Sequence, residues 1–341
     1  MPSATLPAEL HQIARDAARH ARQPAPPRTA TILGLGHYLP SEVVPNGPIA
    51  ERVGVDDEWI VKRTGIHARR RVAPNERTSD LAVFAARRAL QDAGVEPGEL
   101  DYVIVATMTA DEITPNCAPL VAHALGATRA ATYDVGAACT GFLAGLSQAA
   151  ALVEVGRAER ILLIGAESLT RLADWDDKKT AMLWGDGAGA VVLGPSTNGA
   201  GIGRIDLLAD GGLGDTIVAT HENGKIRMDG ISTFKIAVKN LSESTVYTVA
   251  AAGLELDDID LFVYHQANSR IIRAVGERLD LDAAKVADYI AQLGNTSAAS
   301  VPLTLSLSRD DGRLRAGMKV LLGAIGAGFT WGTGVMEWTA T

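Results

Sequence analysis

A repeat along the chain is the feature that most restricts its fold. Residues 93–101 read AGVEPGELD and residues 252–260 read AGLELDDID, and each segment leads into a short apolar run, 102–105 and 261–264. The offset between them is 159 residues (Gly94 to Gly253, 253 − 94 = 159). The same offset places residues 161–163 on 320–322 and the turn at 136–142 on the turn at 295–301. Three correspondences in one register predict two similar structural units.

Each unit alternates helices with strands. Residues 82–93 and 245–252 have helical character, and a glycine of the kind that ends helices follows each of them. The apolar runs that come next are typical of strands buried on both faces. This order predicts a layered α/β fold with one half at residues 29–195 and the other at 200–341. Residues 1–28 form an N-terminal extension outside the repeat, with a helix expected at 10–22.

Composition excludes several classes of protein. The 341 residues are 47% apolar and 21% charged, which is an ordinary globular balance. The net charge of −8 argues against general nucleic-acid binding, and no apolar run is long enough to span a membrane. We expect a cytoplasmic protein without disulfides, since there are two cysteines and no apolar signal segment. No metal-ligand spacing, phosphate loop or nicotinamide fingerprint is present, so no metal or cofactor is expected.

The turn DVGAACTGF at 134–142 places Cys139 between a strand and a helix. At a helix N-terminus the unpaired N–H groups and the dipole favour a thiolate, which predicts a lowered thiol pKa. A nucleophile needs such activation. The alternative is a small buried apolar residue, and that is our interpretation of Cys117.

Two further turns carry polar side chains that the repeat places near Cys139. His265 follows the apolar run at 261–264, at the end of a strand where α/β sheets place their sites. Asn295 lies in the turn that the offset of 159 places opposite the Cys139 turn, where its amide can donate into the same cavity. Small residues at 323–332 would let backbone N–H groups approach a reacting carbonyl.

With these turns in view, the sequence resembles the β-ketoacyl-acyl carrier protein synthase III family, which starts bacterial fatty-acid and polyketide chains. The similarity covers residues 30–338 and is carried by six motifs: DEWIVKRTGI at 57–66, DVGAACTGF at 134–142, WGDGAGAVVL at 184–193, HQANSRII at 265–272, GNTSAASVP at 294–302 and GAGFTWG at 326–332. The resemblance implies a five-layered αβαβα thiolase-like fold and a homodimer.

The resemblance also implies a role for individual residues. Cys139 would take an acyl group from acyl-CoA, with the backbone N–H groups of Cys139 and Ala327 as the oxyanion hole. His265 and Asn295 would stabilise the enolate that malonyl-acyl carrier protein forms on losing CO₂. CoA would contact Trp59, Arg63, Thr64 and Asn268. The basic residues that would meet the acidic carrier protein are Lys235, Arg270 and Arg278.

Three positions depart from the family pattern. Ile325 replaces a phenylalanine next to the active site, which bears on decarboxylation. Lys178 replaces an arginine that stacks on the adenine, and a lysine has no planar face to present. Thr114 replaces the bulky aromatic of acetyl-specific members at a position contributed by the partner subunit, which predicts room for a longer or branched primer.

Other functions fit the same residues less completely. An acyltransferase on this fold would load Cys139 and pass the acyl group to an acceptor without forming a carbon–carbon bond. The chalcone-type and 3-hydroxy-3-methylglutaryl-CoA synthases match the motifs at 294–302 and 326–332 less well. A papain-like protease has its Cys, His and Asn in this chain order but a cysteine near the mature N-terminus. A carrier-protein binder without activity is the remaining alternative.

Overall fold

Two stacked sheets form the centre of the computed structural model, which describes residues 28–340. The first sheet has the order β1-β7-β6-β4-β5, with β1 at Ala30–Tyr38, β4 at Tyr102–Ala106, β5 at Ala131–Val135, β6 at Ile161–Ser168 and β7 at Asp186–Pro195. The second has the order β11-β12-β13-β8, with β8 at Ile202–Ala209, β11 at Leu261–Tyr264, β12 at Lys319–Gly326 and β13 at Thr330–Glu337.

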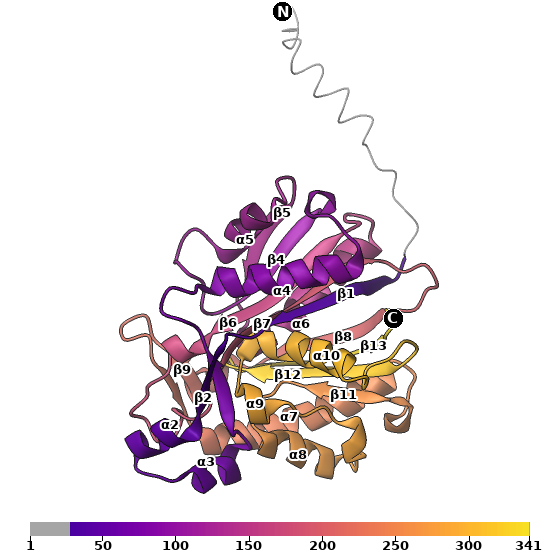
Figure 1. The fold of residues 1–341 in the computed structure, drawn as a ribbon. Coiled ribbons are helices and arrows are strands. Elements are labelled where there is room, and N and C mark those ends of the chain that lie inside the picture. The colour runs from indigo at the N-terminus through magenta and orange to yellow at the C-terminus, as the bar shows by residue number, and fades with distance from the viewer. Residues whose placement is uncertain (1–27, 341) are drawn as a thin grey trace, which may run out of the picture.

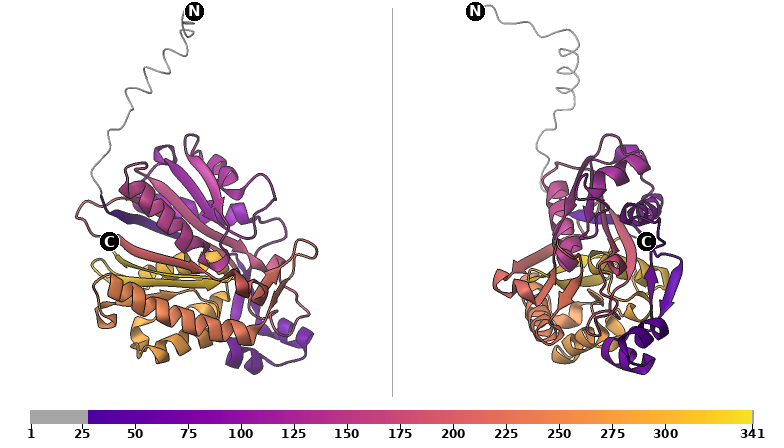
Figure 2. Two further views of the ribbon diagram at one scale, coloured as in Figure 1. Left: turned by 180° about the vertical axis from the view of Figure 1, so that it is seen from behind. Right: turned by 90° about the vertical axis from the view of Figure 1, so that its left-hand side faces the viewer.

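Helices cover both outer faces of the sheets and fill the space between them (Figures 1 and 2). The helices on the first sheet are α4 (Thr78–Ala93) and α5 (Cys117–Leu125), those between the sheets are α6 (Gly141–Glu154) and α10 (Ser300–Asp310), and those on the second sheet are α7 (Gly230–Ala251) and α8 (Ser269–Arg278). This is the five-layered αβαβα thiolase fold.

Smaller elements pack beside the layers. They are β2 (Glu42–Pro45), α2 (Asn46–Val53), α3 (Asp57–Thr64), β3 (Ala68–Arg71), β9 (Ile217–Ala219), β10 (Ile226–Met228) and α9 (Ile290–Leu293). Short 3₁₀ turns include η2 (Ala138–Thr140) and η7 (Ser297–Ala299). Figure 1 shows α2, α3 and β2 at one end of the stacked sheets. Within residues 28–340 no helix is both long and apolar enough to cross a membrane.

The two sheets share strand pairing in the register of the repeat. Parallel β4 and β6 pair Tyr102 with Ile161, and parallel β11 and β12 pair Leu261 with Val320. Both members of the second pair lie 159 residues after those of the first (261 − 102 and 320 − 161). The turns η2 and η7 keep this offset, and each contains a left-handed non-glycine residue, Ala138 at φ 44° and Ser297 at φ 46°.

The repeat breaks down outside these elements. In the first half the segment at residues 169–185 separates β6 from β7, whereas β12 and β13 form a close hairpin. In the first sheet β5 pairs with β4 along its whole length. The corresponding pairing in the second sheet is one parallel bridge, between Phe262 and Val286. The strand β7 ends at Pro195 and β8 begins at Ile202, on either side of the junction expected from sequence. The boundaries of the two halves stay a prediction.

Helix α7 begins earlier than the sequence predicts. It starts at Gly230 instead of near residue 245, because the Asp229 side chain accepts hydrogen bonds from the backbone N–H groups of Ile231 and Ser232 and so caps the helix. The helix expected at 10–22, and all of the N-terminal extension except Arg28, lie outside the described residues.

Apolar burial between the layers holds the two halves together. Phe142 and Leu146 of α6, Leu163 of β6, Leu305 of α10 and Leu322 of β12 belong to one buried cluster and are each at most 1% exposed. Burial of each such side chain stabilises the folded state by about 1.5–3 kcal/mol. The contact between the halves is therefore part of the hydrophobic core and not a loose domain interface.

Close backbone packing between the halves predicts the effect of one substitution. A Cβ at Gly165 of β6 would lie 2.3 Å from the carbonyl oxygen of Ala298, so Gly165→Ala must force strand and turn apart. We expect it to lower the free energy of unfolding by about 3 kcal/mol. In α8, Gly276 has no atom within 4 Å of the added Cβ, and Gly276→Ala should raise it by about 0.5 kcal/mol. Equal midpoints for the two variants in urea titrations would contradict this packing.

Candidate active site

A cavity of about 1560 Å³ brings together most of the residues singled out in the sequence. Both halves of the chain contribute to its wall, as does the segment at 169–185 that interrupts the repeat. The predicted residues that line it are Trp59, Arg63, Thr64, Cys139, Lys235, His265, Asn268, Arg270, Asn295, Ile325 and Ala327.

Cys139 lies in the turn η2, immediately before α6, and is half-buried at the cavity wall. The Thr140 hydroxyl donates to the carbonyl oxygen of Ala137 (2.6 Å) and lies 2.9 Å from the hydroxyl of Thr330. A Cβ at Gly326 would lie only 2.7 Å from the backbone nitrogen of Cys139. The turn is therefore held against the end of β12, and glycine is required at position 326 for this approach.

The predicted lowering of the pKa of this thiol is wrong, although Cys139 does lie at the start of α6. Burial raises the pKa of the Cys139 thiol to about 12, and a side-chain hydrogen bond with Ser297 opposes this only partly. The sequence shows the helix N-terminus, but it does not show how much protein surrounds the sulfur. Removal of water from around the sulfur therefore disfavours the thiolate.

His265 follows β11, and its backbone N–H donates to the carbonyl oxygen of Gly323 (2.7 Å). The ring is 2% exposed, and its Nδ1 has no hydrogen-bond partner within residues 28–340. Burial lowers the pKa of the imidazole to about 3. The ring is therefore neutral at physiological pH, where it can donate one N–H to an oxygen in the cavity.

Asn295 is fixed in its turn from both sides. Its backbone N–H donates to the carbonyl of Leu183 (2.7 Å), and its own carbonyl accepts from the N–H of Gly185 (2.9 Å). The side-chain Oδ1 accepts from the backbone N–H of Ser297 at 2.9 Å. Because the carbonyl end of the amide is engaged, the amide NH₂ is the end left to donate into the cavity.

The candidate oxyanion donors also lie at the cavity. Ala327 follows the last residue of β12, and its carbonyl accepts a hydrogen bond from the Thr330 hydroxyl (3.1 Å). The same hydroxyl contacts Thr140, so one threonine links the Ala327 turn to the Cys139 turn. This leaves two backbone segments facing one space, as a site for a carbonyl oxygen requires.

The wall of the cavity carries an aromatic ring that lies close to two cations. The Arg63 guanidinium carbon lies 3.9 Å from the centre of the Trp59 ring, and the Lys178 amine lies 5.2 Å from it. Asn268 caps α8 and donates from Nδ2 to the carbonyl of Arg63 (3.1 Å). The Thr64 hydroxyl is buried and donates to the carbonyl of Ile60, so it holds α3 in place.

Of the basic residues, Lys235 and Arg270 are exposed at the cavity, whereas Arg278 is exposed at the far end of α8 and does not line it. Thr114 also lies outside the cavity of its own chain. It is exposed beside Ile113, which is 94% exposed.

Sequence reasoning missed Ser297, which lines the cavity, and the buried Glu167, which does not line it. Glu167 is fully buried in β6, where it accepts hydrogen bonds from the Thr109 hydroxyl (2.7 Å) and the Met108 N–H (3.2 Å). The available signal was that Glu167 directly follows the apolar run at 161–166. An acid at such a place is expected to be buried, and buried acids are rare without partners.

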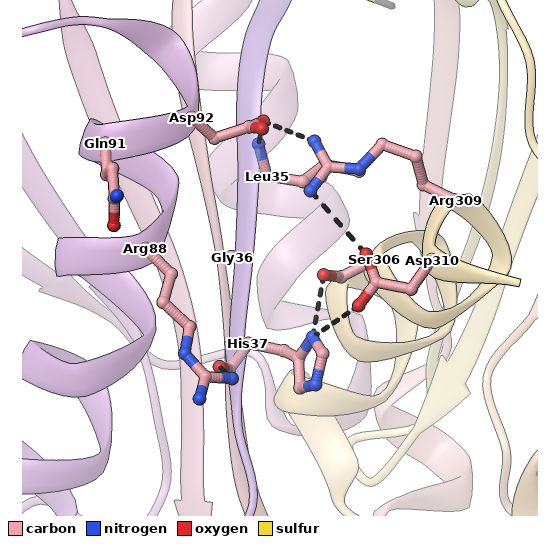
Figure 3. A pocket seen from close by; sticks show the side chains of 9 residues that line it. All are labelled: Leu35, Gly36, His37, Arg88, Gln91, Asp92, Ser306, Arg309 and Asp310. Atoms are coloured by element: carbon pink, nitrogen blue, oxygen red, sulfur yellow. Dashed lines mark hydrogen bonds and ion pairs between the residues drawn. The ribbon is translucent and has the colours of Figure 1, made fainter.

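A second hollow, of about 540 Å³, lies between β1, α4 and α10 and contains none of the predicted residues (Figure 3). Its polar groups pair with one another: His37 Nδ1 lies 2.8 Å from the Ser306 hydroxyl, Arg309 pairs with Asp92, and Asp310 lies near both His37 and Arg309. This seam joins the two halves. Neither here nor elsewhere in residues 28–340 do three or more His, Cys, Asp or Glu side chains form a metal-binding group.

The two cysteines should differ in reactivity. Cys139 lines the cavity, whereas Cys117 is 0% exposed and burial raises its pKa. We expect iodoacetamide at pH 8 to add one carbamidomethyl group per chain, detected by intact mass and located by peptide mapping at Cys139. The Cys139→Ala variant should add none and Cys117→Ala should still add one. Equal labelling of both thiols in the folded protein would contradict this assignment.

Comparison with known proteins agrees with this geometry. The family model of 3-oxoacyl-acyl-carrier-protein synthase III matches residues 133–211, and the model of its C-terminal part matches residues 249–338. The β-ketoacyl-acyl-carrier-protein synthase III of Geobacillus kaustophilus is 42% identical over 91% of this chain and 99% of its own, and that of Cereibacter sphaeroides is 44% identical over the same shares.

Solved structures agree in the same way. The 3-oxoacyl-acyl-carrier-protein synthase III of Aquifex aeolicus superposes with a TM-score of 0.89 at 38% identity, covering 91% of this chain and 100% of that one. The priming β-ketosynthase of the R1128 polyketide pathway gives 0.89 at 34% identity, covering 94% and 99%. The chain belongs to the β-ketoacyl-acyl carrier protein synthase III family.

Proposed function

We propose that this transferase starts fatty-acid or polyketide chains by decarboxylative Claisen condensation. It takes an acyl group from acyl-CoA onto Cys139 and joins it to malonyl-acyl carrier protein. The observation that carries this proposal is that Cys139, His265 and Asn295, which come from both halves, line one cavity. The proposed reaction uses no cofactor.

The first half-reaction acylates Cys139. The sulfur attacks the thioester carbonyl of acyl-CoA, the carbonyl oxygen gains negative charge, and the carbon–sulfur bond to CoA breaks. The backbone N–H groups of Cys139 and Ala327 stabilise the developing oxyanion, because donors already fixed in place need no reorganisation. Trp59, Arg63, Thr64 and Asn268 hold the CoA at the mouth of the cavity.

The second half-reaction forms the carbon–carbon bond. The bond between the malonyl α-carbon and its carboxylate breaks, CO₂ leaves, and the electron pair moves into a thioester enolate. His265 and Asn295 donate hydrogen bonds to the enolate oxygen, and a neutral imidazole suits this role because it carries an N–H without a buried charge. The enolate carbon then attacks the acyl-Cys139 carbonyl and releases the thiolate.

Three basic residues, Lys235, Arg270 and Arg278, form the proposed contact with the acidic carrier protein. They are exposed, and Lys235 and Arg270 stand at the cavity through which the pantetheine arm must enter. On a chain of net charge −8 such residues steer an acidic partner to one place.

A homodimer and a cytoplasmic location are part of the same proposal. The strand β5 forms an edge of the first sheet, and an edge strand is a template for pairing with a second chain. The exposed Ile113 and Thr114 could then reach the cavity of the partner. Acyl-CoA and carrier protein are substrates met in the cytoplasm.

Plain acyl transfer is the alternative that one observation keeps open. Ile325 is 5% exposed and lines the cavity where the family has a phenylalanine. An acyltransferase would discharge acyl-Cys139 to an acceptor without release of CO₂. Measuring CO₂ together with the mass of the product separates the two reactions.

Variants of the donor pair should separate the half-reactions. We expect His265→Ala and Asn295→Ala to keep acylation of Cys139 within about threefold while CO₂ release from malonyl-acyl carrier protein falls about 10²–10³-fold, as when one oxyanion donor is lost. Intact mass follows the first step and radiolabelled CO₂ the second. Lys239 is exposed on α7, so Lys239→Ala serves as the surface control. Gln266 is not a suitable control, because it is buried and its side chain bonds to the backbone. Unchanged CO₂ release in both active-site variants would contradict the assignment.

The size of residue 114 should set the choice of primer. With threonine at this position we expect the native enzyme to be acylated by isobutyryl-CoA and longer primers as well as by acetyl-CoA. The Thr114→Phe variant should lose the longer primers by about tenfold, since it fills space in the partner's cavity. Competition between acyl-CoAs, read by intact mass, gives the ratios. Strict acetyl preference in the native enzyme would refute the assignment.

A further inference from the structure

A buried arginine lies next to the site and has no part in the reaction scheme above. Residues 69–71 are three arginines, and the last of them, Arg71, is exposed and pairs with Glu42. Arg69 of β3 is instead 0% exposed. Within residues 28–340 its Nε has no hydrogen-bond partner, and its other nitrogens donate to neutral oxygen atoms. Because burial of a cation without a carboxylate is costly, this arginine needs a reason beyond packing.

The guanidinium joins three segments of the chain. Nη1 donates to the carbonyl of Val44 in β2 (3.1 Å), and Nη2 donates to Asn46 Oδ1 (2.8 Å) and to the carbonyl of Met182 (2.8 Å). Asn46 is itself buried and donates from Nδ2 to the carbonyl of Ile66 (2.8 Å). One planar group with fixed donors thus ties the strands β2 and β3 to the segment at 169–185.

The carbonyl that Arg69 holds comes just before the two backbone bonds that fix Asn295. The Asn295 N–H donates to the carbonyl of Leu183 at 2.7 Å, and the Gly185 N–H donates to the carbonyl of Asn295 at 2.9 Å. A Cβ at Gly294 would lie 3.2 Å from the Cβ of Arg69, and one at Gly185 would lie 3.3 Å from it. Arg69 therefore packs against both sides of this bridge, although it does not line the cavity as Asn295 does.

We propose that Arg69 is a positioning residue for Asn295 in the step that forms the carbon–carbon bond. The guanidinium holds the carbonyl of Met182, which fixes the residues that follow it, and residues 183–185 hold the backbone of Asn295 from both sides. The inference rests on the proposed function, in which the Asn295 amide donates to the enolate oxygen. A displacement of about 1 Å can cost about 10²-fold in rate, so support of this backbone bears directly on the reaction.

This arrangement predicts an effect on one half-reaction. The Cys139 turn is held by other elements, through the close approach of Gly326 in β12 and the contact between the hydroxyls of Thr140 and Thr330. Loss of the Arg69 guanidinium should therefore spare acylation of the cysteine. A residue that only stabilised the fold would affect both half-reactions alike.

The test compares Arg69→Met with a control in the same buried network, Asn46→Ala. Arg69→Met removes the bond to Met182, whereas Asn46→Ala removes two buried bonds and leaves that one in place. Both variants should unfold at lower urea concentration. We expect Arg69→Met, once acylated, to release CO₂ from malonyl-acyl carrier protein about 10²-fold more slowly than the native enzyme. Acylation of Cys139 should stay within about threefold in both variants, as should CO₂ release in Asn46→Ala, since the bond to Met182 remains there.

A double variant tests whether Arg69 acts through Asn295. Arg69→Met combined with Asn295→Ala should release CO₂ within about twofold of the rate of Asn295→Ala alone, because the two changes remove one function. Losses that multiply would overturn the proposal. Native CO₂ release in folded Arg69→Met, or equal losses in Arg69→Met and Asn46→Ala, would also overturn it.

If Arg69→Met does not fold, Arg69→Lys takes its place. The lysine keeps a charge but presents one amine instead of a fork, so it cannot bond to Val44, Asn46 and Met182 in the same geometry. We expect CO₂ release to fall about tenfold with acylation unchanged. Native CO₂ release in this variant would overturn the proposal.

Hydrogen exchange gives a readout that does not depend on the reaction. The backbone amides of Gly185 and Asn295 should exchange about tenfold faster in Arg69→Met than in the native protein, since their bridge loses its support, and within about threefold in Asn46→Ala. Unchanged exchange in Arg69→Met would overturn the positioning role. If the native protein releases no CO₂ while exchange rises as expected, the proposed function fails and the support of Asn295 by Arg69 stands.

Discussion

Direct backbone contact between the two halves is the constraint on which the site depends. At Gly326 the end of β12 touches the Cys139 turn, and at Gly165 the end of β6 touches the turn that carries Ser297. A side chain at either glycine would move one turn away from the other. The geometry of the nucleophile, the oxyanion donors and the amide of Asn295 therefore follows from how closely two strands approach the opposite turns.

The same close packing determines the chemical state of the site. Exclusion of water raises the pKa of Cys139 and lowers that of His265, so both groups are neutral at rest. A neutral imidazole and a fixed amide are donors suited to an enolate oxygen. A neutral thiol, however, is a poor nucleophile. Burial thus creates both the strength of the donors and the weakness of the nucleophile.

Much of this arrangement could be predicted from sequence. The offset of 159 residues gave the register of both parallel strand pairs and the facing turns, because strand pairing repeats when the chain does. The motif at 134–142 located Cys139 at the start of a helix, since turn residues and helix periodicity are local signals. Local reasoning failed where distant atoms decide the outcome. The sign of the Cys139 pKa shift depends on packing between residues over 100 apart, and the early start of α7 depends on a cap at Asp229.

A structure of the enzyme with an acyl group on Cys139 tests the central claim most directly. The account predicts that the thioester oxygen lies about 2.7–3.1 Å from the backbone nitrogens of both Cys139 and Ala327. The donors of His265 and Asn295 should then face the open side of the same carbonyl carbon. An acyl group directed away from Ala327, or His265 and Asn295 opening into a different space, would contradict it.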